Sequence, residues 1–173
     1  MFAKLNRKIF ISEYPKGELY ISYGDHSRIR YYKTIRSSEA LSIIPERYRS
    51  KFLLLLVEIT NNIPAHTDSG ITCNINFYID SGNYQTNFWK VLDGDQTYQV
   101  ANQTNGKVFK PDAVELVDSF FAQAGDVYLL DVTKPHSVEC DTPGLKRVAL
   151  SLQTASFTFD EVKEMLKETG YMD

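Results

Sequence analysis

The chain has 173 residues, of which 43% are apolar and 13% aromatic, enough for one sizeable core at the usual size of a single domain. Its 19 Lys and Arg against 22 Asp and Glu give a formal charge of −3, which argues against general nucleic acid binding. The longest apolar run, residues 52–57, is far shorter than the roughly 20 residues of a membrane-spanning helix, and no secretion signal is evident, so we expect a cytoplasmic protein with no membrane partner.

The N-terminal part predicts short antiparallel strands followed by a helix. Residues 8–13, 18–23 and 29–35 are rich in Ile, Tyr and Phe and are separated by Pro and Gly. Ser38 can cap a short helix that starts at Glu39, and Pro45 can end or kink it. Cys73 and Cys140 form no CxxC pair, and we interpret both as reduced thiols of the core.

The rest of the chain predicts closely spaced strands and one further helix. Strand signals cover residues 52–59, 63–67, 71–79, 86–92, 127–131, 137–140 and 148–153. The polar segment 93–111 is longer than most loops and indicates either a mobile lid over the site, which we favour, or a hairpin with a weak signal. Thr158 and Glu161 resemble a capping box for an amphipathic helix over about residues 158–169. These signals predict one mainly β domain, a sandwich or barrel with a few flanking helices.

The chain has three histidines, and one of them begins an HxD motif. His66 and Asp68 are two residues apart, so in a strand their side chains share one face about 6.5 Å apart along the backbone. An imidazole and a carboxylate can therefore converge on one point, although such a pair also arises by chance and can be a plain hydrogen-bonded pair. His26, beside Gly24 and Asp25, is expected to be a loop residue.

A second element adds another imidazole and a cation. A Gly-Asp turn at 125–126 opens an apolar strand, a short turn follows, and His136 begins the next strand near a sheet rim. Eleven residues later comes Arg147, on the face opposite Val148 and its apolar partners. Two imidazoles and one carboxylate are the ligand set of non-haem iron(II) oxygenases, and a buried guanidinium binds a carboxylate through two hydrogen bonds.

This order of motifs, HxD, then His, then Arg, resembles the 2-oxoglutarate/iron(II)-dependent oxygenases over residues 52–153. The sequence is similar to small aspartyl/asparaginyl-hydroxylase-like or prolyl-hydroxylase-like members of phages and bacteria. The resemblance implies a double-stranded β-helix (jelly-roll, cupin-like) as the core at about 52–153, with N-terminal strands and a helix at 1–51. It implies Fe(II) held by His66, Asp68 and His136, and 2-oxoglutarate held by Arg147. Members with an Arg-x-Ser motif add a hydroxyl where this chain has Ala149, so a second carboxylate donor must come from elsewhere.

The strand after the HxD motif offers candidates for that donor. Asn74, Asn76 and Tyr78 alternate with apolar residues and share one face. We expect Asn76 and Tyr78 to help bind 2-oxoglutarate and Asn74 to contact the substrate if this face lines the barrel, although a solvated outer face gives the same pattern. Trp89 is a further candidate for the substrate pocket, with core packing as the alternative.

Three readings of the function follow. The first is a dioxygenase that hydroxylates an amino acid, a peptide side chain or a small metabolite and releases succinate and CO2. The second is a metal- and 2-oxoglutarate-binding β-barrel without turnover, such as a sensor. The third, a cupin-like isomerase or hydrolase, gives no reason for Arg147. The substrate and the oligomeric state stay open.

Overall fold

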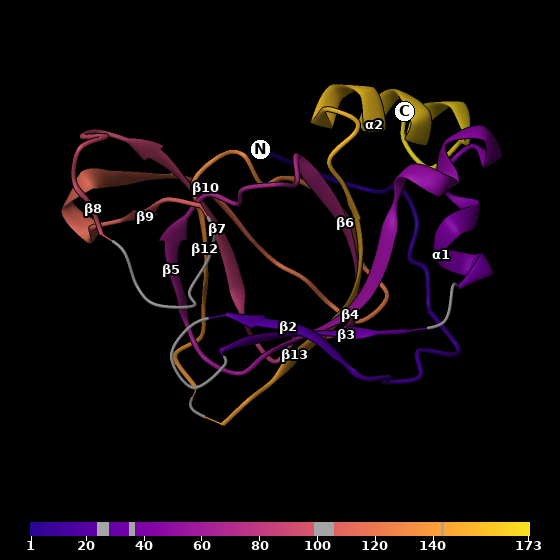
Figure 1. Cartoon of the computed structure of the whole chain (residues 1–173), viewed down its shortest axis with the longest axis horizontal. Coiled ribbons are helices and arrows are strands. Elements are labelled where there is room, and N and C mark those ends of the chain that lie inside the picture. Colours follow the sequence, from indigo (N-terminus) through magenta and orange to yellow (C-terminus); the bar gives the residue numbers. More distant parts are fainter. Residues whose placement is uncertain (24–27, 35–36, 99–105, 143) are drawn as a thin grey trace.

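The computed structural model describes residues 1–23, 28–34, 37–98, 106–142 and 144–173, and within them two antiparallel sheets face each other (Figure 1). The seven-stranded sheet runs in the order β1 (Phe2–Lys4), β11 (Val127–Asp131), β6 (Cys73–Asp80), β13 (Arg147–Thr154), β4 (Leu53–Ile59), β3 (Ile29–Lys33) and β2 (Leu19–Tyr23). The six-stranded sheet runs in the order β10 (Val114–Phe121), β7 (Gln85–Val91), β12 (His136–Glu139), β5 (Ile63–His66), β9 (Val108–Phe109) and β8 (Thr97–Tyr98).

From β4 to β7 and again from β10 to β13, consecutive strands alternate between the two sheets. This is the winding of a double-stranded β-helix, and the predicted fold class is confirmed. The chain passes from one sheet to the other between consecutive strands, so residues far apart in sequence meet on the two inner faces.

Residue alternation decides which side chains reach the space between the sheets. On β6, Cys73, Ile75 and Phe77 pack into the outer core with the helices, while the intervening polar residues point inward. On β13, Leu150 and Leu152 join the same outer core. The larger sheet therefore has an apolar outer face, covered by helices, and a partly polar inner face.

Helices α1 (Ser38–Ser42) and α2 (Phe159–Glu168) cover that outer face (Figure 1). The 3₁₀ helix η2 (Glu46–Lys51) follows α1 in the chain. The cap of α1 is Ser37, one residue before the predicted Ser38, and Pro45 precedes η2. The predicted capping box of Thr158 and Glu161 is present in α2.

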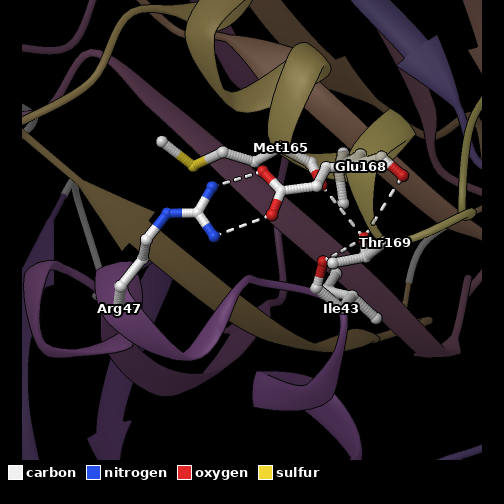
Figure 2. A network of polar contacts seen from close by, with 6 residues as sticks. Ile43, Arg47, Met165, Glu168 and Thr169 are labelled. Carbon is white, nitrogen blue, oxygen red and sulfur yellow. Dashed lines mark hydrogen bonds and ion pairs between the residues drawn. The ribbon is translucent and has the colours of Figure 1, made fainter.

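The end of α2 is tied to the segment that follows α1 (Figure 2). Arg47 Nη1 donates a hydrogen bond of 2.7 Å to Glu168 Oε1, and the Thr169 hydroxyl donates to the carbonyl oxygen of Ile43 at 2.7 Å. These contacts fix the helices over the sheet and lie outside the cavity described below.

The sequence prediction was wrong about several strands. Residues 8–13 form no strand: Ile11 is buried in the outer core, and the Ile9 amide bonds to the Gly125 carbonyl outside any ladder. Sequence patterning missed β1 and β10. The edge strand β10 exposes most of its residues and has an irregular register between Leu116 and Asp118, so it shows no alternation.

The described ends of the polar segment 93–111 pair with each other as β8 and β9, with Thr97 opposite Phe109. For these ends the hairpin interpretation is the better one. Residues 99–105 lie outside the described residues, so the predicted lid stays a prediction. In the described part of the chain, no helix combines the length and apolarity needed to cross a membrane.

Candidate metal centre

The three predicted metal ligands meet at one end of the smaller sheet. His66 is the last residue of β5, His136 is the first of β12, and the two face each other in the antiparallel register. Asp68 follows two residues after His66, and its carboxylate Oδ1 lies 3.4 Å from His66 Nε2. One potential ligand atom from each of the three residues lies within 4.8 Å of the others, which is a spacing that one metal ion can bridge.

Backbone carbonyls orient both imidazoles. The Nδ1 atoms of His66 and His136 lie 2.8 Å and 2.9 Å from the carbonyl oxygens of Pro64 and Lys134. A carbonyl only accepts, so each Nδ1 is the donor and carries the proton in the neutral ring. Both Nε2 atoms then keep a free lone pair, as metal ligation requires.

The electrostatics of the cluster suit a cation. Burial, together with the charge of His66, lowers the pKa of His136 to about 4, so this ring is neutral near pH 7. Burial alone would lower the pKa of His66, but the hydrogen bond and charge of Asp68 outweigh it and raise that pKa overall. For Asp68, the His66 hydrogen bond and the charges of both imidazoles outweigh burial and lower the pKa of the carboxyl. The cluster thus offers a carboxylate and two imidazoles.

A cavity of about 720 Å³ lies between the two sheets and contains this cluster. Its size falls in the range of sites that bury small-molecule ligands. His66, Asp68, His136 and Arg147 all line it, although they come from three separate chain segments.

Arg147 is 3% exposed. Its Nη1 donates to the Thr86 hydroxyl at 2.8 Å, its Nη2 donates to the Tyr84 carbonyl oxygen, and its Cζ lies 5.1 Å from the centre of the Tyr78 ring. Its Nε has no hydrogen-bond partner among the described residues, and no carboxylate there forms an ion pair with it. Burial lowers the pKa of the guanidinium, which marks an uncompensated charge.

Arg147 could instead serve to neutralise a carboxylate of the core, but the described residues do not support this. Asp126 forms ion pairs with Lys4 at 3.0 Å and Lys8 at 3.7 Å, and Asp131 accepts hydrogen bonds from Thr133. The buried Arg147 guanidinium therefore faces the cavity without an anionic partner among the described residues.

Strand register relates this guanidinium to the metal cluster. On neighbouring strands, Thr86 pairs with Val138, and Phe88 pairs with His136. Thr86, to which the Arg147 guanidinium is bonded, is therefore two residues along the ladder from the position of His136, a spacing of about 7 Å between backbone positions. A five-carbon dicarboxylate has a carbon backbone of about 5 Å from C–C bonds of about 1.5 Å, so it can connect the two positions.

The polar face of β6 looks into the cavity, which is one of the two orientations that the sequence left open. Asn74, Asn76 and Tyr78 all line it, and the Tyr78 hydroxyl and Asn74 Oδ1 are buried without a hydrogen-bond partner in the described part of the chain. Trp89 does not line the cavity. Its ring packs against the small cluster of Ala65, Phe109 and Val114 while its Nε1 donates to the Ser137 hydroxyl, so core packing describes it better than a substrate contact. His26 lies outside the described residues.

Many cavity residues were missing from the sequence prediction, among them the polar residues Tyr31, Thr86, Ser151 and Gln153. Ser151 and Gln153 share the alternation parity of Arg147 on β13, and this signal was available in the sequence. Tyr31 and Thr86 reach the cavity through the pairing of β3 and β7 with distant strands, which no local pattern reveals.

Comparison with known proteins identifies no family. No family model matches the chain, and no curated protein matches it. Among solved structures, hydroxypropylphosphonic acid epoxidase from S. wedmorenis is 13% identical, with 84% of this chain and 58% of that chain covered and a TM-score of 0.41. A structure of Bacillus subtilis oxalate decarboxylase, studied for its Mn(II) centres, is 15% identical, with coverages of 79% and 28% and a TM-score of 0.41. The chain thus spans only part of the length of these proteins, and likeness at this level carries no argument about activity.

Proposed function

We propose that the protein is an Fe(II)- and 2-oxoglutarate-dependent oxygenase. The proposal rests on one cavity that holds both a His-Asp-His cluster and a buried guanidinium, at positions about two residues apart along the ladder. This guanidinium lacks a carboxylate partner among the described residues. A ligand that coordinates a metal at one end and presents a carboxylate at the other satisfies both groups.

The residues present fit the metal. With Nδ1 bonded to a backbone carbonyl, the neutral forms of His66 and His136 offer Nε2 as a ligand atom beside the Asp68 carboxylate, and three protein ligands leave coordination positions for an oxoacid and dioxygen. When bound, Fe(II) supplies dioxygen activation coupled to decarboxylation of the oxoacid, a chemistry that side chains cannot provide.

The protein binds and orients the cosubstrate. Arg147 donates hydrogen bonds to its distal carboxylate, and the Tyr78 hydroxyl is the second donor, because it is buried and unpartnered among the described residues and its ring contacts the guanidinium. Asn76 lines the same wall. Ile59, Ile63 and Val138 line the cavity near this end and exclude water, which strengthens the charged hydrogen bonds.

The experiment that tests the proposal measures oxoacid consumption. Iron-loaded protein should convert 2-oxoglutarate to succinate slowly without a primary substrate and faster with one. Well-folded protein that binds 2-oxoglutarate but forms no succinate with any of a panel of amino acids, peptides and metabolites would favour the second candidate, a binding protein without turnover. The unpaired Arg147 disfavours an isomerase or hydrolase, because chemistry on a metal-bound water needs no carboxylate grip.

A further inference from the structure

Three polar residues form a continuous patch on the inner face of the larger sheet. Asn74 on β6 lies opposite Gln153 on β13, and Ser151 precedes Gln153 by two residues on the same face. We call Asn74, Ser151 and Gln153 the polar trio. All three line the cavity and are at least nine-tenths buried, with exposures of 7%, 2% and 8%.

The polar trio lies at the end of the cavity that holds Asp68, away from Arg147. Gln153 is six residues from Arg147, about 20 Å along β13. Asn74 pairs with Leu130, and two residues later the Val132 carbonyl accepts a hydrogen bond from the Asp68 amide at 2.9 Å. The trio therefore flanks the metal cluster on the side that the proposed cosubstrate leaves free.

This end of the cavity is also the open one. Leu53, which pairs with Gln153, is 46% exposed, whereas Ile59, which pairs with Arg147, is 6% exposed. Tyr20, 52% exposed, lines the cavity as well. A second molecule can therefore reach the polar trio from solvent while Arg147 holds the cosubstrate at the closed end.

One oxygen of the polar trio has no hydrogen-bond partner within the described residues, whereas Ser151 and Gln153 bond to each other. Asn74 Oδ1 is buried without a partner and needs a donor. The Ser151 hydroxyl accepts from Gln153 Nε2 at 3.3 Å, which leaves its own proton to donate. A bound group that both donates and accepts can use the Asn74 oxygen and the Ser151 proton together.

Charge at this end of the cavity is limited. Among the described residues that line the cavity, Lys51, Asp68 and Arg147 carry formal charges. Asp68 belongs to the metal cluster, Arg147 is reserved for the oxoacid, and Lys51 is exposed at the rim. Apart from the metal centre, a carboxylate or ammonium at the polar trio would have no buried counter-charge, because Lys51 is exposed to solvent, and burying such a charge is unfavourable.

We propose that the primary substrate presents an uncharged amide, either a carboxamide or a peptide bond, to Asn74, Ser151 and Gln153, and thereby places a neighbouring C–H group at the metal. The inference rests on the proposed function, since it assigns Arg147 to the cosubstrate. An amide supplies a donor and an acceptor in one plane, which matches the unsatisfied Asn74 oxygen and the free Ser151 proton.

The test uses Zn(II)-loaded protein with and without 2-oxoglutarate, in which no turnover occurs because zinc has no redox chemistry. The probes are pairs that differ only in charge: the N-acetyl amides of valine, leucine, proline and asparagine, and the matching N-acetyl amino acids with a free carboxylate. Ligand-detected NMR titration gives the Kd of each. We expect the amide to bind at least about tenfold more tightly than its carboxylate in one or more pairs, since a buried unpaired charge is penalised.

Variants assign the preference to the polar trio. Asn74→Leu and Ser151→Ala should each weaken amide binding by about tenfold and leave the 2-oxoglutarate Kd unchanged. Arg147→Met should do the reverse. Asn6→Leu is the matched control, because Asn6 is an exposed asparagine that bonds to Asp173, and it should change neither Kd. Melting curves identify any variant that fails to fold, and Ser151→Ala removes a single atom.

Equal affinities within every pair, preference for the carboxylate, no binding of any probe, or full amide affinity in both trio variants would each overturn the inference. If the proposed function is wrong, the result is different. 2-oxoglutarate would then fail to bind the wild-type protein, while the preference for the amide, and its loss in Asn74→Leu, would persist.

Discussion

Arg147→Met separates a ligand-binding guanidinium from a structural one. The side chain is 3% exposed, so its bonds to a carboxylate form away from water. Truncating one member of such a buried charge pair costs about 2–5 kcal/mol, which corresponds to roughly 30- to several-thousand-fold weaker binding of 2-oxoglutarate. Metal affinity should not change, because the metal cluster is formed by other residues.

The expected effect on stability is the more decisive part. The substitution leaves the Thr86 hydroxyl and the Tyr84 carbonyl without their donor, at about 1–3 kcal/mol each, but it also removes a buried charge whose desolvation costs several kcal/mol. The two effects offset each other, so the melting temperature without oxoacid should stay close to that of the wild type. Breaking a buried ion pair would instead cost about 3–5 kcal/mol, or roughly 6–20 °C in a domain of this size.

Calorimetric titration of 2-oxoglutarate into Mn(II)-substituted protein, alongside a melting curve, measures both quantities. Arg147→Lys should give intermediate affinity, because an ammonium lacks the planar fork of a guanidinium. Arg47→Met is the matched control: its ion pair with Glu168 is on the surface (Figure 2), so it should cost less than about 1 kcal/mol and leave oxoacid binding unchanged. Unchanged affinity in Arg147→Met would remove Arg147 from the site and refute the reasoning.

Further predictions concern the metal centre and the fold. His66→Ala, Asp68→Ala and His136→Ala should each abolish succinate formation and weaken Fe(II) binding in anaerobic titrations; a variant with wild-type affinity would show that its residue is no ligand. Because the pKa of His66 is raised, protons should compete with the metal from above about pH 6.5, and affinity should fall about tenfold for each pH unit below that pKa; a flat profile from pH 8 to 5 would contradict this. Asp68→Asn should move the onset to lower pH, because burial then dominates the pKa of His66. Thr158→Ala should cost about 1 kcal/mol of stability, measured by urea unfolding, without changing metal affinity.

The fold could be predicted where both faces of a strand are specified. On β6, alternating Ile, Phe and polar residues predict one apolar and one polar face, and the structure shows the apolar face in the outer core and the polar face on the cavity. The same reasoning fails for β10, an edge strand with little burial on either face, and for residues 8–13, whose apolar side chains pack without joining a ladder. Alternation reports burial, and it signals a strand only where burial and pairing coincide.

The candidate site shows a similar division. His66 and Asp68 are predictable because they are two residues apart, although Asp68 lies just after the end of β5, and Arg147 because its strand parity turns it inward. The residues that bond to the Arg147 guanidinium come from a distant part of the chain. Thr86 contacts it only because β7 lies opposite β13 across the cavity, and the carboxylate of Asp126 pairs with Lys4. The sequence can therefore predict a buried cation, but only the structure shows whether a protein carboxylate pairs with it or whether a ligand must.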